Sequence, residues 1–337
     1  MAGDDAADPG ELLTGLVHRA DLDGLVRLVD DCCARRDWEL LRRLRDEARH
    51  AVGTGRQLWP AATLAEYRLA LRAPSDWAAG VLDEGSGRFT IGPLTEVVAQ
   101  HHTWAELAPR LEPGPRAAFV AHERVLRGEA VAGRSTAALP DVLDLPFHLV
   151  AWEPAYRLAT YDDDGGEFPS PDVPSTLSEV PLPTSAPEQV DDEAVELALR
   201  QLVEPWTTTS NGRAEIVAVE GDAPGALRAL GVPSARWAPL TTPAAVAWLA
   251  WAGASGGAHG RRRGAAAGRF GALWLVAALV DAVDDWPLPL DELGALAAEL
   301  RWWWWDAHEP LTGWQLQLVV EDAAEGLAWA ITARDAA

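Results

Sequence analysis

Apolar residues recur every three or four positions in the first part of the chain, a spacing that predicts amphipathic helices. The expected helices cover 22–29, 38–44, 59–71, 94–100 and 116–126. Asp37 is placed to cap the second of them, and glycine- or proline-rich breaks separate the later ones. Region 1–140 is therefore predicted to be helical, as a compact bundle or as a short α-solenoid of stacked helix pairs.

Region 141–190 differs in composition, because it is rich in proline and in acidic residues. Prolines recur from Pro169 to Pro187, after the acidic run 162–164. Between Asp141 and Glu204, 15 acidic residues stand against 2 arginines. Proline interrupts helices and central strands, so we expect an extended acidic connector.

Region 191–337 mixes helical and strand-like spacing. The expected elements are helices at 191–203, 224–230 and from Thr242 onward, a buried helix at 271–280, and strands at 214–219 and 236–240. Alternating apolar residues over 314–320 and 327–331, with a turn between them, predict an antiparallel hairpin with one buried face. The predicted fold class is α+β, with a mostly α N-terminal region and a tryptophan-rich α+β C-terminal domain that ends in this hairpin.

The charged residues exclude several classes of protein. All 28 positive residues are arginine, and a chain without lysine cannot form a lysine Schiff base, a Walker A loop or a protein-kinase site. The net charge of −23 includes no basic stripe, so nucleic-acid binding is not expected. The excess acid is either a solvated surface or a docking surface for a basic partner.

The cysteines and the first residues indicate the cytoplasm. Cys32 and Cys33 are adjacent and are the only cysteines, which fits a reducing compartment. Asp4 and Asp5 stand where a secretory signal would carry positive charge. The apolar run 271–280 is far shorter than the roughly 20 residues of a membrane span. We therefore expect a soluble cytoplasmic protein with no membrane association, no metal and no cofactor.

The segment 255–264 is unusual because it concentrates glycine and arginine. Glycine recurs at every fourth position, at Gly256, Gly260, Gly264 and Gly268. On a helix these positions would form one smooth ridge against which another backbone packs closely. Alternatively, the segment with Gly257 and His259 is a loop at a helix N-terminus, where the three arginines hold an anion. The arginines of that second hypothesis are Arg261, Arg262 and Arg263.

Four consecutive tryptophans, 302–305, are the second unusual feature. If the helix predicted from Leu293 to Leu300 continues through them, Trp302 and Trp305 point to a face beside the core. Such a pair serves either as a ligand or partner platform or as packing between helix and hairpin. His308 follows soon after, but without the spacing of a metal or hydrolase motif.

Several short motifs resemble an uncharacterised actinobacterial family known only as a domain of unknown function. They are Ala121–Gly128, Ser210–Arg213 with Asn211, Gly256–Gly260, Gly268–Arg269 and Thr332–Asp335. The resemblance covers most of the chain and implies a shared fold, without an activity.

Three functions are consistent with these features. The first is a non-enzymatic binding or scaffold protein with a protein partner and a small-anion contact in the glycine/arginine segment. The second is an enzyme for a phosphorylated or carboxylated small molecule, with Arg269 among its anion clamps and His259 or His308 as base. The third is an acidic antagonist of a basic toxin or nuclease. A pocket where Asn211, Arg213, His259 and Arg269 converge would favour the enzyme.

Overall fold

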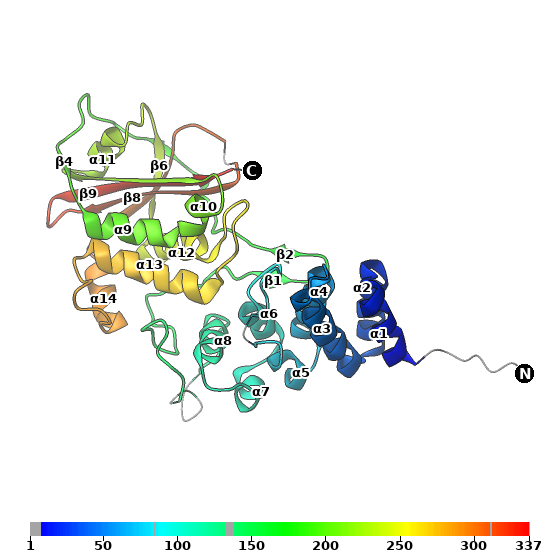
Figure 1. The fold of residues 1–337 in the computed structure, drawn as a ribbon. Helices are drawn as coiled ribbons and strands as arrows, with labels where there is room; N and C mark the ends of the chain where they lie inside the picture. The colour runs from blue at the N-terminus through cyan, green and yellow to red at the C-terminus, as the bar shows by residue number, and fades with distance from the viewer. Residues whose placement is uncertain (1–7, 84, 132–135, 137, 311, 337) are drawn as a thin grey trace, which may run out of the picture. The chain divides into compact units, whose positions relative to one another are not determined.

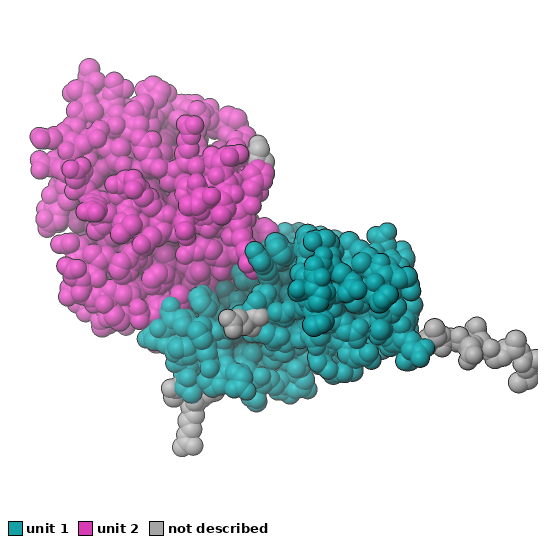
Figure 2. Space-filling view, in the orientation of Figure 1, with its two compact units in different colours: residues 1–142, 160–167 teal, residues 143–159, 168–337 magenta. Residues whose placement is uncertain are grey.

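The computed structural model describes residues 8–83, 85–131, 136, 138–310 and 312–336, so Asp4 and Asp5 lie outside it. The chain forms two compact units, which Figure 2 colours separately. Unit 1 consists of residues 1–142 and 160–167, and unit 2 of residues 143–159 and 168–337. Segment 141–190, expected as a connector, is thus shared between the units. The overall class is α+β, as predicted.

Unit 1 is built from helices in two layers. Its described helices are α1 (Pro9–Arg19), α2 (Leu22–Arg35), α3 (Trp38–Gly53), α4 (Trp59–Arg72), α5 (Ser75–Ala79), α6 (Leu94–His101), α7 (Trp104–Leu107), the short 3-10 helix Ala108–Arg110 and α8 (Pro115–Leu126). In one layer α2 packs on α4, α4 on α6 and α6 on α8, and in the other α1 packs on α3 and α5 on α7 (Figure 1). Unit 1 is therefore the mostly helical N-terminal region that was predicted.

Local sequence signals explain where these helices begin. The Asp37 side chain accepts a hydrogen bond from the Leu40 N–H at 3.1 Å, so the predicted cap is confirmed. Thr103 and Glu106 form a reciprocal capping box at the start of α7. Each cap satisfies backbone N–H groups that have no partner inside the helix.

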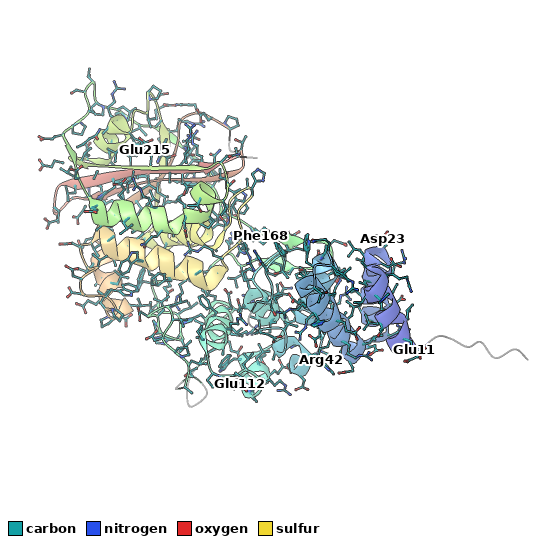
Figure 3. All side chains as sticks on the ribbon, in the orientation of Figure 1. Glu11, Asp23, Arg42, Glu112, Phe168 and Glu215 are labelled. Carbon is teal, nitrogen blue, oxygen red and sulfur yellow. The ribbon has the colours of Figure 1, made fainter. Side chains whose placement is uncertain are left out.

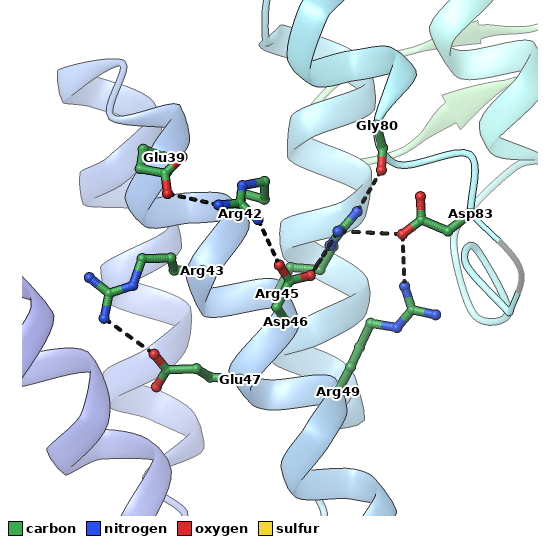
Figure 4. A network of polar contacts seen from close by, with 9 residues as sticks. All are labelled: Glu39, Arg42, Arg43, Arg45, Asp46, Glu47, Arg49, Gly80 and Asp83. Atoms are coloured by element: carbon green, nitrogen blue, oxygen red, sulfur yellow. Dashed lines mark hydrogen bonds and ion pairs between the residues drawn. The ribbon is translucent and has the colours of Figure 1, made fainter. Parts of the chain in front are cut away.

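Arginines of α3 hold the chain that follows α5 (Figure 4). Arg45 is only 6% exposed and donates to the Gly80 carbonyl at 2.9 Å. Arg45 and Arg49 approach the Asp83 carboxylate at 3.4 and 3.6 Å. The segment 80–83 is therefore attached to α3 by charge-assisted contacts.

A short hairpin from the proline-rich region completes unit 1. Strands β1 (Thr160–Tyr161) and β2 (Gly166–Glu167) pair antiparallel. The Tyr67 hydroxyl on α4 donates to the Asp162 carbonyl at 2.5 Å, and Tyr161 donates to the buried Glu96 carboxylate at 2.5 Å. These side chains fix the hairpin against α4 and α6.

Unit 2 is centred on an antiparallel seven-stranded sheet in the order β3-β6-β7-β8-β9-β5-β4. The strands are β3 (Ser178–Glu179), β4 (Gln189–Val190), β5 (Arg213–Glu220), β6 (Arg236–Leu240), β7 (Arg301–Asp306), β8 (Trp314–Asp322) and β9 (Leu327–Asp335). The predicted hairpin is confirmed as β8 and β9, with Asp322 paired to Leu327 beside the turn. The expectation of one buried face is wrong, because Gln317 and Val319 are as buried as Leu316, Leu318 and Val320, which alternate with them.

Helices cover the two faces of the sheet unequally (Figure 1). The helices of unit 2 are α9 (Glu193–Leu202), α10 (Glu204–Thr208), α11 (Ala223–Ala229), α12 (Thr242–Ala254), α13 (Ala265–Leu279) and α14 (Leu290–Ala297). On one face α9, α10 and α12 contact the strands, and α13 packs behind α9 and α12. On the other face α11 contacts β5, β8 and β9. None of the helices in the described ranges is both long and apolar enough to cross a membrane.

Gly268 allows α13 to approach α12 closely. A Cβ at Gly268 would overlap the Ala250 carbonyl oxygen and lie 2.8 Å from the Ala254 Cβ. We expect Gly268→Ala to lower the free energy of unfolding by about 1–3 kcal/mol, because the extra methyl overpacks the helix contact. Urea unfolding measures this change. The matched control is Gly53→Ala at the last residue of α3, where a Cβ meets nothing within 4 Å, so the added methyl should not overpack. Equal effects at the two positions would contradict the prediction.

Candidate functional site

Part of the sheet face that carries α11 is left uncovered, and a pocket of about 480 Å³ lies there. Helix α11 packs its Ala223, Ala226 and Leu227 over Val219 and Val319. Beyond it, the strands continue without a helix above them. We call this hollow the sheet pocket. Its lining residues are Asn211, Arg213, Glu215, Leu230, Gly231, Val232, Pro233, Trp305, Ala307, Thr332, Arg334 and Ala336.

The strand register brings the polar residues of the sheet pocket together. Arg213 on β5 is paired with Arg334 on β9, and Glu215 with Thr332. Residues paired across strands share a face, and their Cβ atoms lie about 4.5–5.5 Å apart. Figure 3 labels Glu215 on the face that carries α11. Two guanidinium groups therefore project from neighbouring positions over the same uncovered surface.

The charges in the sheet pocket are unequally satisfied. Arg334 forms an ion pair with Glu309. The Arg213 side chain has no hydrogen-bond or ion-pair partner among the described residues. Like charges at directly paired positions destabilise a sheet. A negatively charged ligand between the two arginines would offset that repulsion.

The floor of the sheet pocket is apolar, with one buried amide beneath it. Trp305 is 1% exposed, and its indole N–H donates to the Leu318 carbonyl at 3.1 Å. Gln317 is paired with Thr332 and is 2% exposed. Its side-chain amide has no hydrogen bond to any described residue.

The glycine/arginine segment is a loop, so the hypothesis of a helical glycine ridge is wrong. α12 ends at Ala254 and α13 begins at Ala265. Gly257 and Gly264 have φ angles of +69° and +98°, which a helix does not allow. Gly256 and Gly260 approach so closely that a Cβ on either would overlap the other's carbonyl oxygen. Only Gly268 lies on a helix.

The buried Asp335 carboxylate organises this loop. It accepts a hydrogen bond from the Ala258 N–H at 2.6 Å and another from the Ser210 hydroxyl at 2.8 Å. Ser255 accepts from the Trp206 indole N–H at 2.7 Å. The contacts of Asp335 hold the glycine/arginine segment against the end of β9.

The arginines expected to clamp an anion are mostly engaged inside unit 2. Arg263 donates to the Gln201 carbonyl at 2.8 Å at the end of α9, and burial lowers the pKa of its guanidinium. Arg262 is 8% exposed and lies 4.9 Å from the centre of the Phe168 ring. Arg269 is fully buried in an ion pair with Glu153. The structure does not bring these side chains together as one anion site.

The remaining predicted residues are dispersed. Arg261 and His259 are exposed on the loop, and neither is among the residues that line the sheet pocket. His308 lies 3.4 Å from Glu179. Asn211, Arg213 and Trp305 are the predicted site residues that the sheet pocket gathers. The convergence of Asn211 and Arg213 with His259 and Arg269, which would have favoured the enzyme, is not found among the described residues.

The four tryptophans form a strand, so the expected helical continuation is wrong. Residues 301–306 are β7, which pairs with β6 on one side and β8 on the other. Side chains alternate along a strand, so Trp302 and Trp305 point to opposite faces of the sheet. Trp303 stacks on Trp237 of β6 with ring centres 5.0 Å apart. Aromatic residues are enriched in strands, where they pack against cross-strand and same-face neighbours.

Several lining residues were missed by the sequence reasoning. Thr332 and Arg334 occupy alternate positions of β9, as Gln315 and Gln317 do on β8. This alternation of polar residues in the final hairpin was the available signal. In the described ranges, no group of three or more His, Cys, Asp or Glu side chains is arranged to hold a metal ion.

Comparison with known proteins identifies a family and no activity. A family model described as a family of unknown function (DUF6183) matches residues 23–337. No curated protein and no solved structure matches the chain. The match confirms that the sequence motifs mark an uncharacterised family and that the likeness covers most of the chain.

Proposed function

The chain belongs to this family of unknown function, DUF6183, and we propose that it is a binding protein whose unit 2 holds a small anionic, partly apolar molecule in the sheet pocket. The observation that carries the proposal is the pairing of Arg213 with Arg334 on an uncovered sheet face. Guanidinium groups bind carboxylates and phosphates in a bidentate way. A ligand anion there would satisfy Arg213 and offset its repulsion with Arg334.

The remainder of the sheet pocket supports a ligand with an apolar part. Val232 and Pro233 line the sheet pocket beside the arginines, above the buried ring of Trp305. The volume of about 480 Å³ lies within the roughly 300–1,000 Å³ of small-molecule sites.

The rival enzyme hypothesis has less support. Arg262, Arg263 and Arg269 are held by separate internal partners, so they do not present an anion clamp to His259 or His308. The proposal includes a cytoplasmic location, because Cys32 and Cys33 are both free thiols.

Thermal unfolding with small aromatic anions tests the proposal. We expect phenyl phosphate and benzoate to raise the melting temperature at fixed ionic strength, because a ligand bound only to the folded state stabilises it. Neutral benzamide, which lacks the charge, should have a smaller effect. Arg213→Ala should abolish the specific rise.

The matched control is Arg200→Ala, which removes an exposed arginine on α9 that pairs with Glu196. This variant should respond to the anions as the wild type does. If neither anion stabilises the wild type more than benzamide, or if Arg213→Ala responds fully, the proposed site is wrong.

A further inference from the structure

Three large apolar side chains are exposed side by side on unit 1. Val52, Trp59 and Phe89 are 37%, 42% and 55% exposed, and we call them the apolar patch. The Trp59 and Phe89 ring centres lie 4.7 Å apart, with the rings tilted by 48°. The three border a hollow of about 180 Å³. Single exposed apolar residues are ordinary, whereas clustered ones mark interaction sites.

The loop that carries Phe89 is held in place by polar contacts. Glu66 on α4 is 4% exposed and accepts a hydrogen bond from the Gly87 N–H at 2.8 Å. Arg49 on α3 donates to the Ser86 hydroxyl at 3.0 Å, and its contact with Asp83 is drawn in Figure 4. Thr90 donates to the Gly92 carbonyl at 2.7 Å. The apolar patch is therefore preformed, which lowers the ordering cost of binding.

The charge around the apolar patch is opposite to that of the whole protein. The hollow is lined by the guanidinium groups of Arg49 and Arg88 and by one carboxylate, that of Glu66, which is only 4% exposed. The whole chain has 51 acidic residues against 28 arginines. The Arg88 guanidinium lies 5.3 Å from the centre of the Phe89 ring. Charge complementarity therefore favours an acidic occupant.

The size of the hollow favours a side chain over a whole small molecule. About 180 Å³ is below the roughly 300–1,000 Å³ of small-molecule sites. Interfaces are commonly anchored by one large apolar residue in such a hollow. We propose that the apolar patch is a docking site for a protein segment in which a large apolar side chain is flanked by aspartate or glutamate.

Labelled peptides test this docking site on the full chain. Three 12-residue peptides are compared by fluorescence anisotropy: a central tryptophan flanked by Asp and Glu, the same tryptophan flanked by Lys and Arg, and a central alanine flanked by Asp and Glu. We expect the first to bind at least about tenfold more tightly than either of the others, because it alone supplies both anchor and charge. Equal binding of the acidic and basic tryptophan peptides would overturn the proposal, and so would no binding at all.

Variants locate the binding. Phe89→Ser should weaken binding of the acidic tryptophan peptide at least tenfold, and Arg88→Glu should shift the preference toward the basic peptide. The matched control is Leu197→Ser, which removes an equally exposed apolar side chain, 53% exposed, from α9 of unit 2. Melting temperatures establish that each variant is folded. Unchanged binding by Phe89→Ser overturns the proposal, as does a wild-type dimer that Phe89→Ser dissociates, since a second copy would then cover the apolar patch.

Discussion

Replacing Arg269 with methionine should lower the free energy of unfolding of unit 2 by about 3–5 kcal/mol, because the variant leaves a buried carboxylate without its counterion. Arg269 and Glu153 are both fully buried, with their atoms 2.7 and 2.8 Å apart in a two-point contact. Arg269 also donates to the carbonyls of Pro146 and His148. Denaturant unfolding measures the loss.

The partners of Glu153 make its position sensitive to that change. Tyr156 donates to the carboxylate at 2.6 Å, and burial followed by the Glu153 charge raises the pKa of Tyr156 well above its ordinary value. The hydroxyl therefore stays protonated and remains a donor. It cannot replace the positive charge that Arg269 supplies.

A double variant separates the ion pair from general packing. Arg269→Met with Glu153→Met should destabilise less than the sum of the single changes, because neither charge is then left alone. Arg157→Ala, at an exposed pair with Asp172, is the control and should cost about 0–1 kcal/mol. Additive losses in the double variant would show that the pair is not coupled.

Gly257→Ala should cause the second large decrease in the free energy of unfolding. Its φ of +69° costs a residue with a side chain about 1–2 kcal/mol. A Cβ would also overlap the Asp335 carboxylate and lie 3.2 Å from Trp206, which adds about 1–3 kcal/mol of overpacking. Thermal and urea unfolding report the sum.

Gly326→Ala isolates the backbone contribution. Gly326 has a φ of +67° between β8 and β9, and a Cβ there meets nothing within 4 Å. This control should therefore show the left-handed backbone cost alone. If Gly257→Ala is no more destabilising than Gly326→Ala, the contact with Asp335 does not restrict the loop.

The helices of unit 1 could be predicted because each has its own amphipathic stripe and clear breaks on either side. Leu25, Leu28 and Val29 are buried on α2, where the stripe places them. The strand of tryptophans could not be predicted in the same way. A run of uniformly apolar residues shows neither the helical nor the strand period, and the preceding leucines favoured a helix.

The helix predicted for the glycine/arginine segment was wrong for a different reason. Spacing of four residues fits a helix, but Gly264 is glycine because its φ is +98°. A sequence does not distinguish a glycine needed for close approach, as at Gly268, from one needed for its backbone angle. The sheet pocket was likewise only partly predictable from the sequence. Arg213 and Trp305 were each identified as candidate site residues from the sequence. That they line one pocket depends on how much of the sheet face α11 leaves uncovered.

The hairpin 160–167 makes unit 1 discontinuous along the chain. During synthesis on the ribosome, α1 to α8 emerge first, while the segment that Tyr67 and Glu96 bind is still to be translated. Part of unit 2, residues 143–159, emerges before unit 1 is complete. Unit 1 can therefore complete its contacts only after residue 167 has left the exit tunnel. A gene fragment that stops at residue 142 would encode the helices of unit 1 without strands β1 and β2.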